Sequence, residues 1–281
     1  MAAIIPAGEV VWGLQLPVQS QSTNFVQAWE STADAADLAV VASAADEAGA
    51  FYVAVCDHVA VPRPADEAMS TTWYDTVATL GWLAALTSRT HLLSHVYVLA
   101  YRHPLATAKA FLTLDHLSGG RAILGAGAGH LASEFALLGV EYDTRGQAVQ
   151  AAIPVIRAAF EDEYPTVGGP GAEVGVGMSP RPVRPGGPPI WIGGSSKAAI
   201  TRAALLGDGV PMGTCTLILG PSGVGKSTLG AQYLCAAAGK GIHTAAFLFD
   251  EQRVTFVNRG DALGMNTSKF VKNNVLNIAK V

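Results

Sequence analysis

Charged side chains are scarce in this chain. Only 14% of its 281 residues are Asp, Glu, Lys or Arg, whereas 50% are hydrophobic. Globular proteins average about 25% charged residues. A chain with so little charge and so much apolar surface folds around a packed core, which excludes an intrinsically disordered protein. The 31 glycines and 15 prolines follow no triplet period, which excludes a collagen-like chain.

Closely spaced cysteines and long hydrophobic runs are missing as well. Cys56, Cys215 and Cys235 show no CxxC spacing, so neither a disulfide framework nor a zinc site is predicted. No run of about 18 apolar residues occurs, and the N-terminus has no basic flank followed by a long apolar segment. We therefore expect a soluble, cytoplasmic, globular protein without a membrane span.

The balance of charge changes sign along the chain. Residues 1–210 carry 11 basic and 19 acidic side chains, whereas residues 211–281 carry 7 basic and 3 acidic ones. Such a change indicates two segments of different origin or with different partners. The basic excess of the second segment is small and lacks interleaved aromatic residues, so nucleic-acid binding is not expected.

Short β-branched and apolar runs alternate with helical stretches, which indicates an α/β fold. Strands are predicted at 10–16, 51–55, 92–99, 121–127, 189–193, 214–220, 243–250 and 275–279, with helices such as 31–48 and 104–117 between them. Eight strands with intervening helices match a (β/α)8 TIM barrel, which usually has about 250 residues. The Gly- and Pro-rich residues 161–189 are predicted to form a lid loop or a plain linker.

Candidate site residues follow several of these strands. Asp57 and His58 close the second strand, and residues at the C-terminal ends of parallel strands face the active site in such folds. A histidine there can move a proton near neutral pH, and the alternative is a capping Asp beside a satisfied histidine. The alternating Gly125, Gly127 and Gly129 bare one face of a strand, so that a flat ring or a backbone segment can approach closely.

Two further groups lie at predicted helix starts. Glu134 is placed either as a proton donor or acceptor, or as a first-turn acid favoured by the helix dipole. A glycine pair and a serine pair then stand between a strand and a helix, where free N–H groups and hydroxyls make a phosphate site: Gly193, Gly194, Ser195 and Ser196. The alternative there is an ordinary serine N-cap.

Taken together, several segments resemble luciferase-like monooxygenases, and within them the subgroup that uses the deazaflavin coenzyme related to FMN. The segments are DHVAVPR, TSRTHLLSHVYVLAYRHP, AKAFLTLDHLSGGRAILGAGAGHLASEFALLGV, RPVRPGGPPIWIGGSS and RAALLGDG, within residues 8–210. The resemblance implies a (β/α)8 barrel that holds a flavin or deazaflavin at its C-terminal face. It implies hydride transfer between this cofactor and a small organic substrate, or oxygen activation if the cofactor is FMN.

The resemblance also implies roles for the candidate residues. Asp57 and His58 would lie beside the cofactor ring, and Glu134 falls near the position where some relatives keep a catalytic acid. The remaining residues would bind the cofactor, the first three near the ring and the last four at its phosphate: Gly125, Gly127, Gly129, Gly193, Gly194, Ser195 and Ser196.

A different motif begins where this resemblance stops, near Val210. The residues GPSGVGKS form a complete GxxxxGK[ST] P-loop between an apolar strand and a helix. Its backbone N–H groups cradle phosphates, Lys226 reaches terminal phosphate oxygens, and Ser227 can hold a magnesium ion. The predicted phosphate-binding residues are Gly220, Gly223, Gly225, Lys226, Ser227 and Thr228.

Residues 211–281 resemble the RecA-like ATPases of the circadian-clock KaiC group. This resemblance implies ATP with Mg²⁺ as the ligand, and Asp250 and Glu251 as acids that polarise the attacking water. The strand that carries the magnesium-binding Walker B Asp is missing, which argues against ATP hydrolysis.

The sequence therefore predicts a chimera of two domains, residues 1–210 with five luciferase-like βα units and residues 211–281 with a P-loop βαβαβ fragment. Five and three strands make eight, so the economical hypothesis is that the fragment completes the barrel. The alternative is a fragment that folds separately, because the first two strands of a P-loop sheet are not neighbours there. The favoured function is a flavin- or deazaflavin-dependent oxidoreductase; the alternatives are a P-loop nucleotide-binding module and an inactive fusion. The substrate, the choice between FMN and deazaflavin, and a homo-oligomeric state stay open.

Overall fold

In a computed structural model the chain divides into two compact units, Met1–Cys215 and Thr216–Val281. The structure describes residues 4–5, 11–22, 26–165, 177–194, 196–208, 231, 234–235, 237–239, 241, 243–248 and 251–280.

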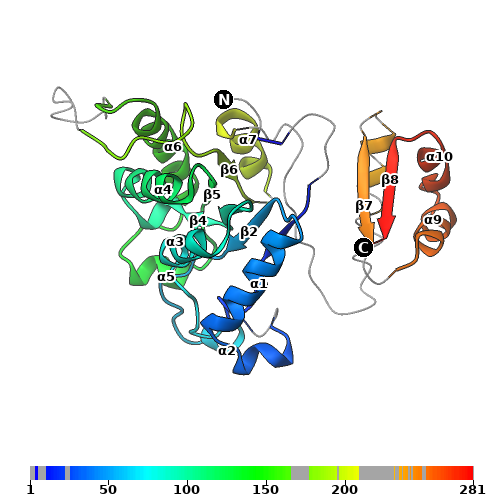
Figure 1. Cartoon of the computed structure of the whole chain (residues 1–281), viewed down its shortest axis with the longest axis horizontal. Coiled ribbons are helices and arrows are strands. Elements are labelled where there is room, and N and C mark those ends of the chain that lie inside the picture. The colour runs from blue at the N-terminus through cyan, green and yellow to red at the C-terminus, as the bar shows by residue number, and fades with distance from the viewer. Residues whose placement is uncertain are drawn as a thin grey trace. The chain divides into compact units, whose positions relative to one another are not determined.

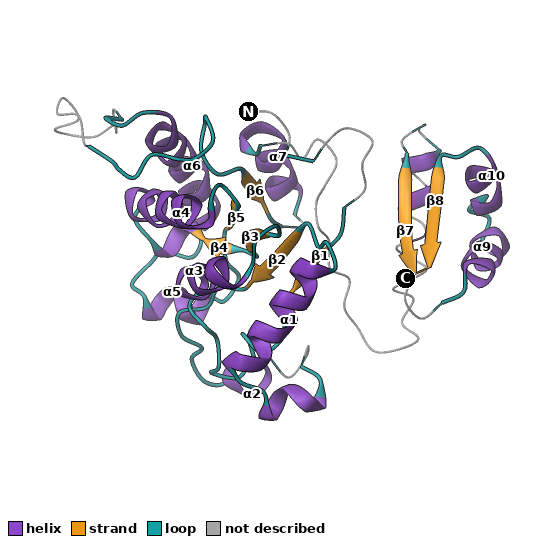
Figure 2. Ribbon diagram, in the orientation of Figure 1, coloured by secondary structure: helices purple, strands orange, loops and turns teal. Residues whose placement is uncertain are grey.

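A parallel sheet of six strands forms the centre of the first unit (Figures 1 and 2). Its strands are β1 (Gly13–Gln15), β2 (Tyr52–Val55), β3 (His91–Ser94), β4 (Tyr97–Val98), β5 (Ala122–Gly127) and β6 (Ile190–Ile192). They follow the order β1-β2-β3-β5-β4, and β6 also pairs with β5. Every pairing is parallel, which confirms the predicted α/β fold. All six residues of β5 are buried, as expected of a central strand covered on both faces.

Helices follow the strands along the chain and cover the sheet (Figure 2). The longer ones are α1 (Ala35–Glu47), α3 (Thr76–Leu86), α4 (Pro104–Ser118), α6 (Arg145–Glu161) and α7 (Lys197–Leu206), and the shorter ones are α2 (Asp66–Met69), α5 (Ala132–Leu137), η1 (Ala28–Thr32) and η2 (Leu99–Tyr101). The helix predicted from 104 begins at Pro104 and ends at Gly119, which takes the left-handed φ of 68° that favours glycine.

The core of the first unit lies between the sheet and these helices. Leu38 of α1, Leu80 of α3, Phe111 of α4 and Ile153 of α6 are completely buried there. Each such side chain stabilises the fold by about 1.5–3 kcal/mol relative to an exposed one. The helices therefore hold the sheet in place through their inward faces.

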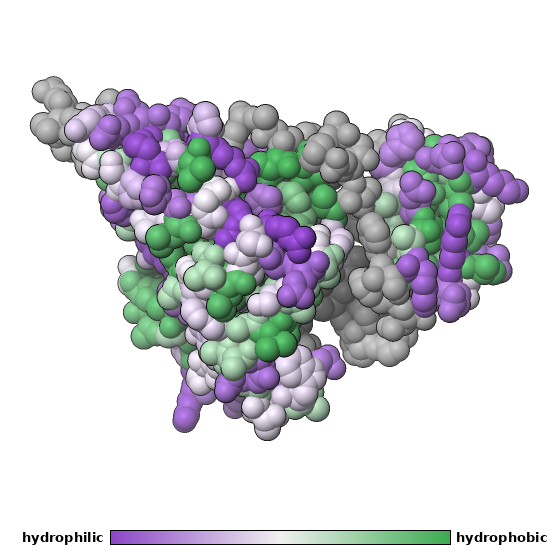
Figure 3. Space-filling view, viewed as in Figure 1, coloured by the Kyte–Doolittle hydropathy of each residue, from purple (hydrophilic) through white to green (hydrophobic). Residues whose placement is uncertain are grey.

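The outer face of the first unit is mixed in character. On the side drawn in Figure 3, hydrophobic residues form separate patches among hydrophilic ones. Exposed apolar side chains include Val40, Leu117 and Leu205. Within the described part of the chain, no helix combines the length and the hydrophobicity that a membrane crossing requires.

The second unit contains β7 (Thr244–Leu248) and β8 (Leu276–Lys280), joined through α9 (Arg253–Ala262) and α10 (Thr267–Lys272). The two strands pair in parallel over five residues. In Figures 1 and 2, α9 and α10 lie on the same side of the strand pair. Phe256 of α9 packs with Leu248, Leu276 and Ile278 in a core of this unit.

The expected completion of a closed barrel by these strands is wrong for the part of the chain that the structure describes. Within that part, β1 pairs only with β2, and β6 pairs only with β5. β7 and β8 form a separate two-stranded sheet, because they pair with each other and bury their apolar residues in their own core. The strand predicted at 214–220 lies outside the described residues.

Candidate active site

The C-terminal edge of the parallel sheet gathers most of the predicted site residues. Asp57 and His58 follow β2, His130 follows β5 by three residues, and Ser196 lies between β6 and α7. His95 directly follows β3. Because all six strands run in the same direction, the segments that follow them meet at one edge, where α/β enzymes bind their ligands.

A cavity of about 530 Å³ opens at this edge. Its size falls within the range of about 300–1,000 Å³ that is typical of small-molecule sites. Five of the predicted cofactor-binding residues line it, together with His130: Gly127, Gly129, Gly193, Gly194 and Ser196. Gly125 is not among the lining residues, and Ser195 lies outside the described residues.

Internal packing leaves no room for a Cβ at any of the five predicted glycines, and the closest approaches occur at three of them. A Cβ on Gly125 would stand 1.9 Å from the carbonyl oxygen of Ser94, so the group that approaches here is backbone. A Cβ on Gly127 or on Gly193 would stand 2.2 Å or 2.5 Å from a methyl group of Val96. The two glycines thus make room for the Val96 side chain, which itself lines the cavity.

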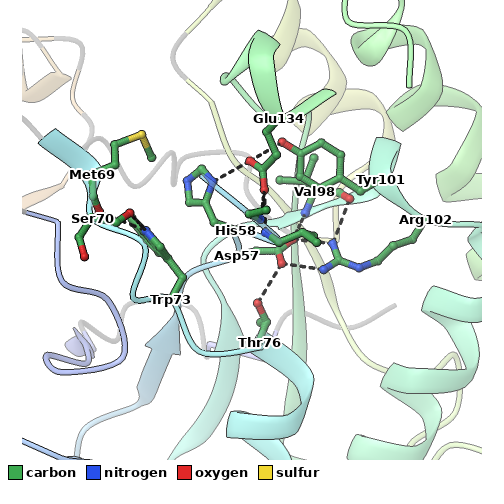
Figure 4. A network of polar contacts seen from close by, with 12 residues as sticks. Asp57, His58, Met69, Ser70, Trp73, Thr76, Val98, Tyr101, Arg102 and Glu134 are labelled. Carbon is green, nitrogen blue, oxygen red and sulfur yellow. Dashed lines mark hydrogen bonds and ion pairs between the residues drawn. The ribbon is translucent and has the colours of Figure 1, made fainter. Parts of the chain in front are cut away.

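Asp57 anchors the loop after β2 through a network shown in Figure 4. Its carboxylate accepts two hydrogen bonds from the Arg102 guanidinium, at 2.6 Å and 2.8 Å, and one from the Val98 amide at 2.7 Å. The Thr76 hydroxyl donates a further one at 3.2 Å. Two-point pairing of guanidinium and carboxylate fixes orientation as well as distance. The network therefore holds the backbone next to His58 in one position.

Glu134 is the second anchor of this site. It is completely buried, and its Oε1 accepts hydrogen bonds from the amides of Val59 and Ala60 at 2.6 Å and 3.0 Å. Its Oε2 contacts His58 Nδ1 at 2.8 Å and accepts the Tyr101 hydroxyl at 2.9 Å (Figure 4). Four donors thus converge on one carboxylate.

These donors determine the charge of Glu134. Burial alone would raise the pKa of Glu134, but the hydrogen bonds from His58 and from the Ala60 and Val59 amides outweigh it and hold the pKa at about 2. Burial and the contact with Glu134 also raise the pKa of Tyr101. Its hydroxyl therefore stays protonated and donates a hydrogen bond to Glu134. An ionised carboxylate can only accept, so the Nδ1 of His58 carries the proton in its contact with Glu134.

Two rings flank His58. Trp73 lies with its ring centroid 4.4 Å away, and its Nε1 donates to the carbonyls of Met69 and Ser70. His130 lies at 5.5 Å with its ring nearly perpendicular, and it lines the cavity. Burial and the neighbouring His58 lower the pKa of His130. No hydrogen bond to His58 Nε2 is found among the described residues.

Several residues of this edge carried no usable signal in the sequence. Arg102 lies 45 positions beyond its partner Asp57. Tyr101 lies 33 positions before its partner Glu134. Only the folded chain brings these residues together. Arg145 and Arg202 line the cavity from α6 and α7. Isolated arginines on helices are usually solvent-exposed, which is why the sequence did not single them out.

The predicted nucleotide site cannot be placed in the same way. Gly220, Gly223, Gly225, Lys226, Ser227, Thr228 and Asp250 all lie outside the described residues. Glu251 is described, and it forms an ion pair with Arg259 of α9. Among the described residues, no cluster of three or more His, Cys, Asp or Glu side chains is suited to a metal ion.

Comparison with known proteins identifies two segments. A family model described as luciferase-like monooxygenase matches residues 16–216, well over half of the chain. An ATPase model described as KaiC gives a short, weak match to residues 202–281. An uncharacterized protein of Mycobacterium tuberculosis is 28% identical over 177 residues, 58% of this chain and 61% of that protein. The chain thus spans about three fifths of the length of such curated relatives.

Solved structures show the same fold. The coenzyme F420 dependent tetrahydromethanopterin reductase from Methanopyrus kandleri aligns with a TM-score of 0.51 and 17% identity, over 97% of this chain and 65% of that chain. Riboflavin lyase, solved with modified FMN and riboflavin, aligns with a TM-score of 0.56 and 14% identity, over 93% of this chain and 67% of that chain. With the model match over residues 16–216, this chain belongs to the luciferase-like monooxygenase family.

Proposed function

We propose that the first unit is a flavin- or deazaflavin-dependent oxidoreductase that acts on a small organic substrate. The observation that carries this proposal is the cavity at the C-terminal edge of the sheet, which His130 lines. The ring of His130 contacts the ring of His58, which Glu134 holds in place. The Methanopyrus reductase depends on coenzyme F420 and riboflavin lyase was solved with modified FMN, which supports a cofactor of this class.

The residues of the cavity fit such a cofactor. Gly127, Gly129 and Gly193 line one wall together with the apolar Val96 side chain, which packs against Gly127 and Gly193. Ser196 caps α7, where its side-chain oxygen accepts the Ala199 amide, and the first turn of a helix offers further N–H donors to a phosphate. A flat ring along the glycines and a phosphate at the start of α7 would use both ends of the cavity.

The protein's part in the chemistry would be to orient the cofactor and to handle protons. When bound, a flavin or deazaflavin supplies the hydride chemistry, and FMN can also activate oxygen. His58 holds or releases a proton at Nε2, because Glu134 keeps Nδ1 protonated. Glu134 is therefore a positioning residue for His58, and Asp57 fixes the loop through Arg102.

An absorbance spectrum of the purified full chain tests this proposal. Bound flavins and deazaflavins absorb at about 370–450 nm, so purified protein, or protein mixed with FMN or the deazaflavin coenzyme and desalted, is expected to keep that colour. Folded protein that retains neither compound would contradict the proposal.

A second candidate function is phosphate or nucleotide binding by Gly220–Thr228, favoured by the complete P-loop motif and by the KaiC model match. Calorimetry of the full chain with ATP and Mg²⁺ tests it. Lys226→Ala is expected to abolish any binding, because Lys226 supplies the charge at the terminal phosphates. No heat of binding in the wild-type chain would leave the P-loop as an inactive remnant.

A further inference from the structure

Three polar side chains meet at the C-terminal ends of the adjacent strands β1, β2 and β3. Gln15 is the last residue of β1, Cys56 directly follows β2, and His95 directly follows β3. Of these three residues, only His95 lines the cavity at this edge of the sheet. Contacts among the three side chains therefore connect a wall of the cavity with the ends of two further strands.

Gln15 joins the other two side chains. Its Nε2 donates to the Cys56 sulfur at 3.1 Å, and its Oε1 lies 3.1 Å from Nδ1 of His95. An amide oxygen can only accept a hydrogen bond, so Nδ1 of His95 carries the proton in this contact. Burial lowers the pKa of His95, which favours the neutral imidazole near neutral pH. A neutral imidazole with its proton on Nδ1 can only accept at Nε2.

Cys56 determines how the Gln15 amide group is turned. Burial raises the pKa of the Cys56 thiol to about 11, so the sulfur stays uncharged. Two hydrogen bonds fix the backbone of Cys56, because its amide donates to the Gln19 side chain at 3.2 Å and its carbonyl accepts the Thr76 hydroxyl at 2.7 Å. The NH₂ group of Gln15 faces this sulfur, which leaves the amide oxygen for His95.

The second ring nitrogen of His95, Nε2, is left for a ligand. His95 is half-buried, and Nε2 has no hydrogen-bond partner among the described residues. Burial is the cause of the lowered pKa of His95. The other charged and titratable side chains that line the cavity form no hydrogen bond or ion pair with His95 in the described part of the chain: His130, Asp143, Arg145 and Arg202. The cavity wall therefore presents a neutral acceptor nitrogen whose tautomer its neighbours set.

We infer that His95 accepts a hydrogen bond from a hydroxyl group of the substrate through Nε2, and that Gln15 and Cys56 position it for this contact. The inference rests on the proposed function and names its substrate class, small organic molecules that carry a hydroxyl group. A site built to hydrogen-bond a hydroxyl rejects an analogue that lacks it, because the polar atom of the site is then left unpaired. His95 is thus a specificity-determining residue, and Gln15 is a positioning residue that acts through it.

Nitrogen-15 NMR of the full chain with labelled histidines tests the tautomer of His95. His95→Phe identifies the His95 signals among those of the seven histidines. In the wild-type chain near neutral pH, we expect a protonated Nδ1 and a bare Nε2. Cys56→Ser keeps an acceptor for the Gln15 amide and should keep this tautomer, whereas Cys56→Ala removes the acceptor and should let the tautomer protonated at Nε2 appear. A wild-type chain protonated at Nε2 would overturn the inference.

Phenol and anisole are matched probes of the substrate contact, because anisole carries a methyl group in place of the hydroxyl hydrogen. NMR titration of the full chain measures the dissociation constant of each probe. We expect phenol to bind about 10-fold more tightly than anisole, the scale of one unpaired acceptor, and to shift the Nε2 signal of His95. His95→Phe should abolish the preference. His116→Phe is the matched control, since His116 is exposed and does not line the cavity.

Circular dichroism establishes that each variant folds, and the absorbance of bound FMN or deazaflavin coenzyme in the same samples separates the two ways to fail. Equal affinity for phenol and anisole, or a preference that persists in folded His95→Phe protein, would overturn the inference while the cofactor still binds. The inference is also overturned if FMN itself shifts the His95 Nε2 signal and excludes phenol, because His95 then contacts the cofactor. A folded wild-type chain that retains neither cofactor contradicts the proposed function, and the inference fails with it.

Discussion

The two edges of the parallel sheet differ in how completely their polar side chains are hydrogen-bonded. At the N-terminal edge, the Asp46 carboxylate accepts hydrogen bonds from the amides of Ser88, Arg89 and Thr90 and from the Ser88 hydroxyl, at 2.6–3.0 Å. Arg121, just before β5, donates to four backbone carbonyls and the Thr87 hydroxyl. At the C-terminal edge, in contrast, Arg202 Nε and His58 Nε2 have no hydrogen-bond partner among the described residues.

This difference separates stability from function within one sheet. Asp46 and Arg121 use their donors and acceptors to join the segments that precede the strands, so the fold itself satisfies them. In contrast, Arg202 lines the cavity with its Nε unpaired among the described residues. His58 lies against His130, which lines the same cavity, and its Nε2 has no partner among those residues. In barrels of this type, the C-terminal face carries the ligand sites and the N-terminal face carries stability.

The largest expected effect is on stability, at the N-terminal edge. Asp46→Ala leaves the buried Thr90 amide, the partly buried amides of Ser88 and Arg89 and the Ser88 hydroxyl without their acceptor, and we expect it to lower the free energy of unfolding by about 3 kcal/mol. Urea denaturation measures this loss, with the exposed Glu67→Gln as control. Cofactor affinity of the folded Asp46→Ala protein should be unchanged; a change comparable to that of a cavity variant would break the distinction between the edges.

The next effect is on chemistry, at the C-terminal edge. His58→Ala removes the ring that Glu134 orients, and we expect the rate of cofactor oxidation or reduction by an organic substrate to fall about 100-fold. Stopped-flow absorbance measures this rate. Glu134 keeps its other three donors in this variant, so the free energy of unfolding should fall by only about 1–3 kcal/mol. Undiminished rates and affinity in this variant would remove His58 from the site.

A smaller effect is expected where Gly127 meets Val96. Gly127→Ala places a Cβ 2.2 Å from a Val96 methyl group, so we expect a loss of about 1–3 kcal/mol of stability through overpacking. Val96→Ala in the same chain removes that methyl group and should restore much of the loss. A double-mutant cycle in urea measures the coupling between the two substitutions. Additive losses would show that the two side chains do not compete for this space.

The pH dependence of stability should be similar at the two edges. Burial raises the pKa of Asp46, but the amides of Thr90, Ser88 and Arg89 lower it to about 2 from 3.8, and that of Glu134 is about 2 instead of 4.5. Groups whose pKa is lowered by folding stabilise the folded state above their unfolded pKa and lose that contribution as pH falls. Unfolding free energy should therefore decline between about pH 4.5 and pH 2. Asp46→Asn or Glu134→Gln should each flatten this slope, and an unchanged slope would contradict the assigned hydrogen bonds.

The sequence predicts the local elements of this molecule well. The strand at 121–127 and the helix from Pro104 to the Gly119 turn are visible because periodicity, proline and glycine act on neighbouring residues. The position of Asp57 and His58 after β2 follows from the same local pattern. The hypothesis that β7 and β8 complete the barrel was wrong, because these strands pair with each other in a separate sheet. Counting strands does not reveal which strands pair.

The partners of the site residues could not be predicted. Glu134 meets His58 across 76 positions of sequence, and its first-turn location gave no indication of four converging donors. Gly125 and Gly127 suggested close approach, but only the folded chain shows Ser94 and Val96 as the neighbours. Such contacts depend on tertiary packing between distant segments, and local sequence patterns do not predict that packing.

Hydrogen–deuterium exchange of the full chain with and without FMN or the deazaflavin coenzyme tests whether the C-terminal edge of the sheet binds the cofactor. We expect the cofactor to slow amide exchange at the C-terminal edge, in residues 57–60, 127–134 and 193–199, because ligand and anchored loops meet there. Exchange in residues 88–91 and 118–122 at the N-terminal edge should not change. Protection confined to the N-terminal edge, or absent from the C-terminal edge at saturating cofactor, would contradict the account.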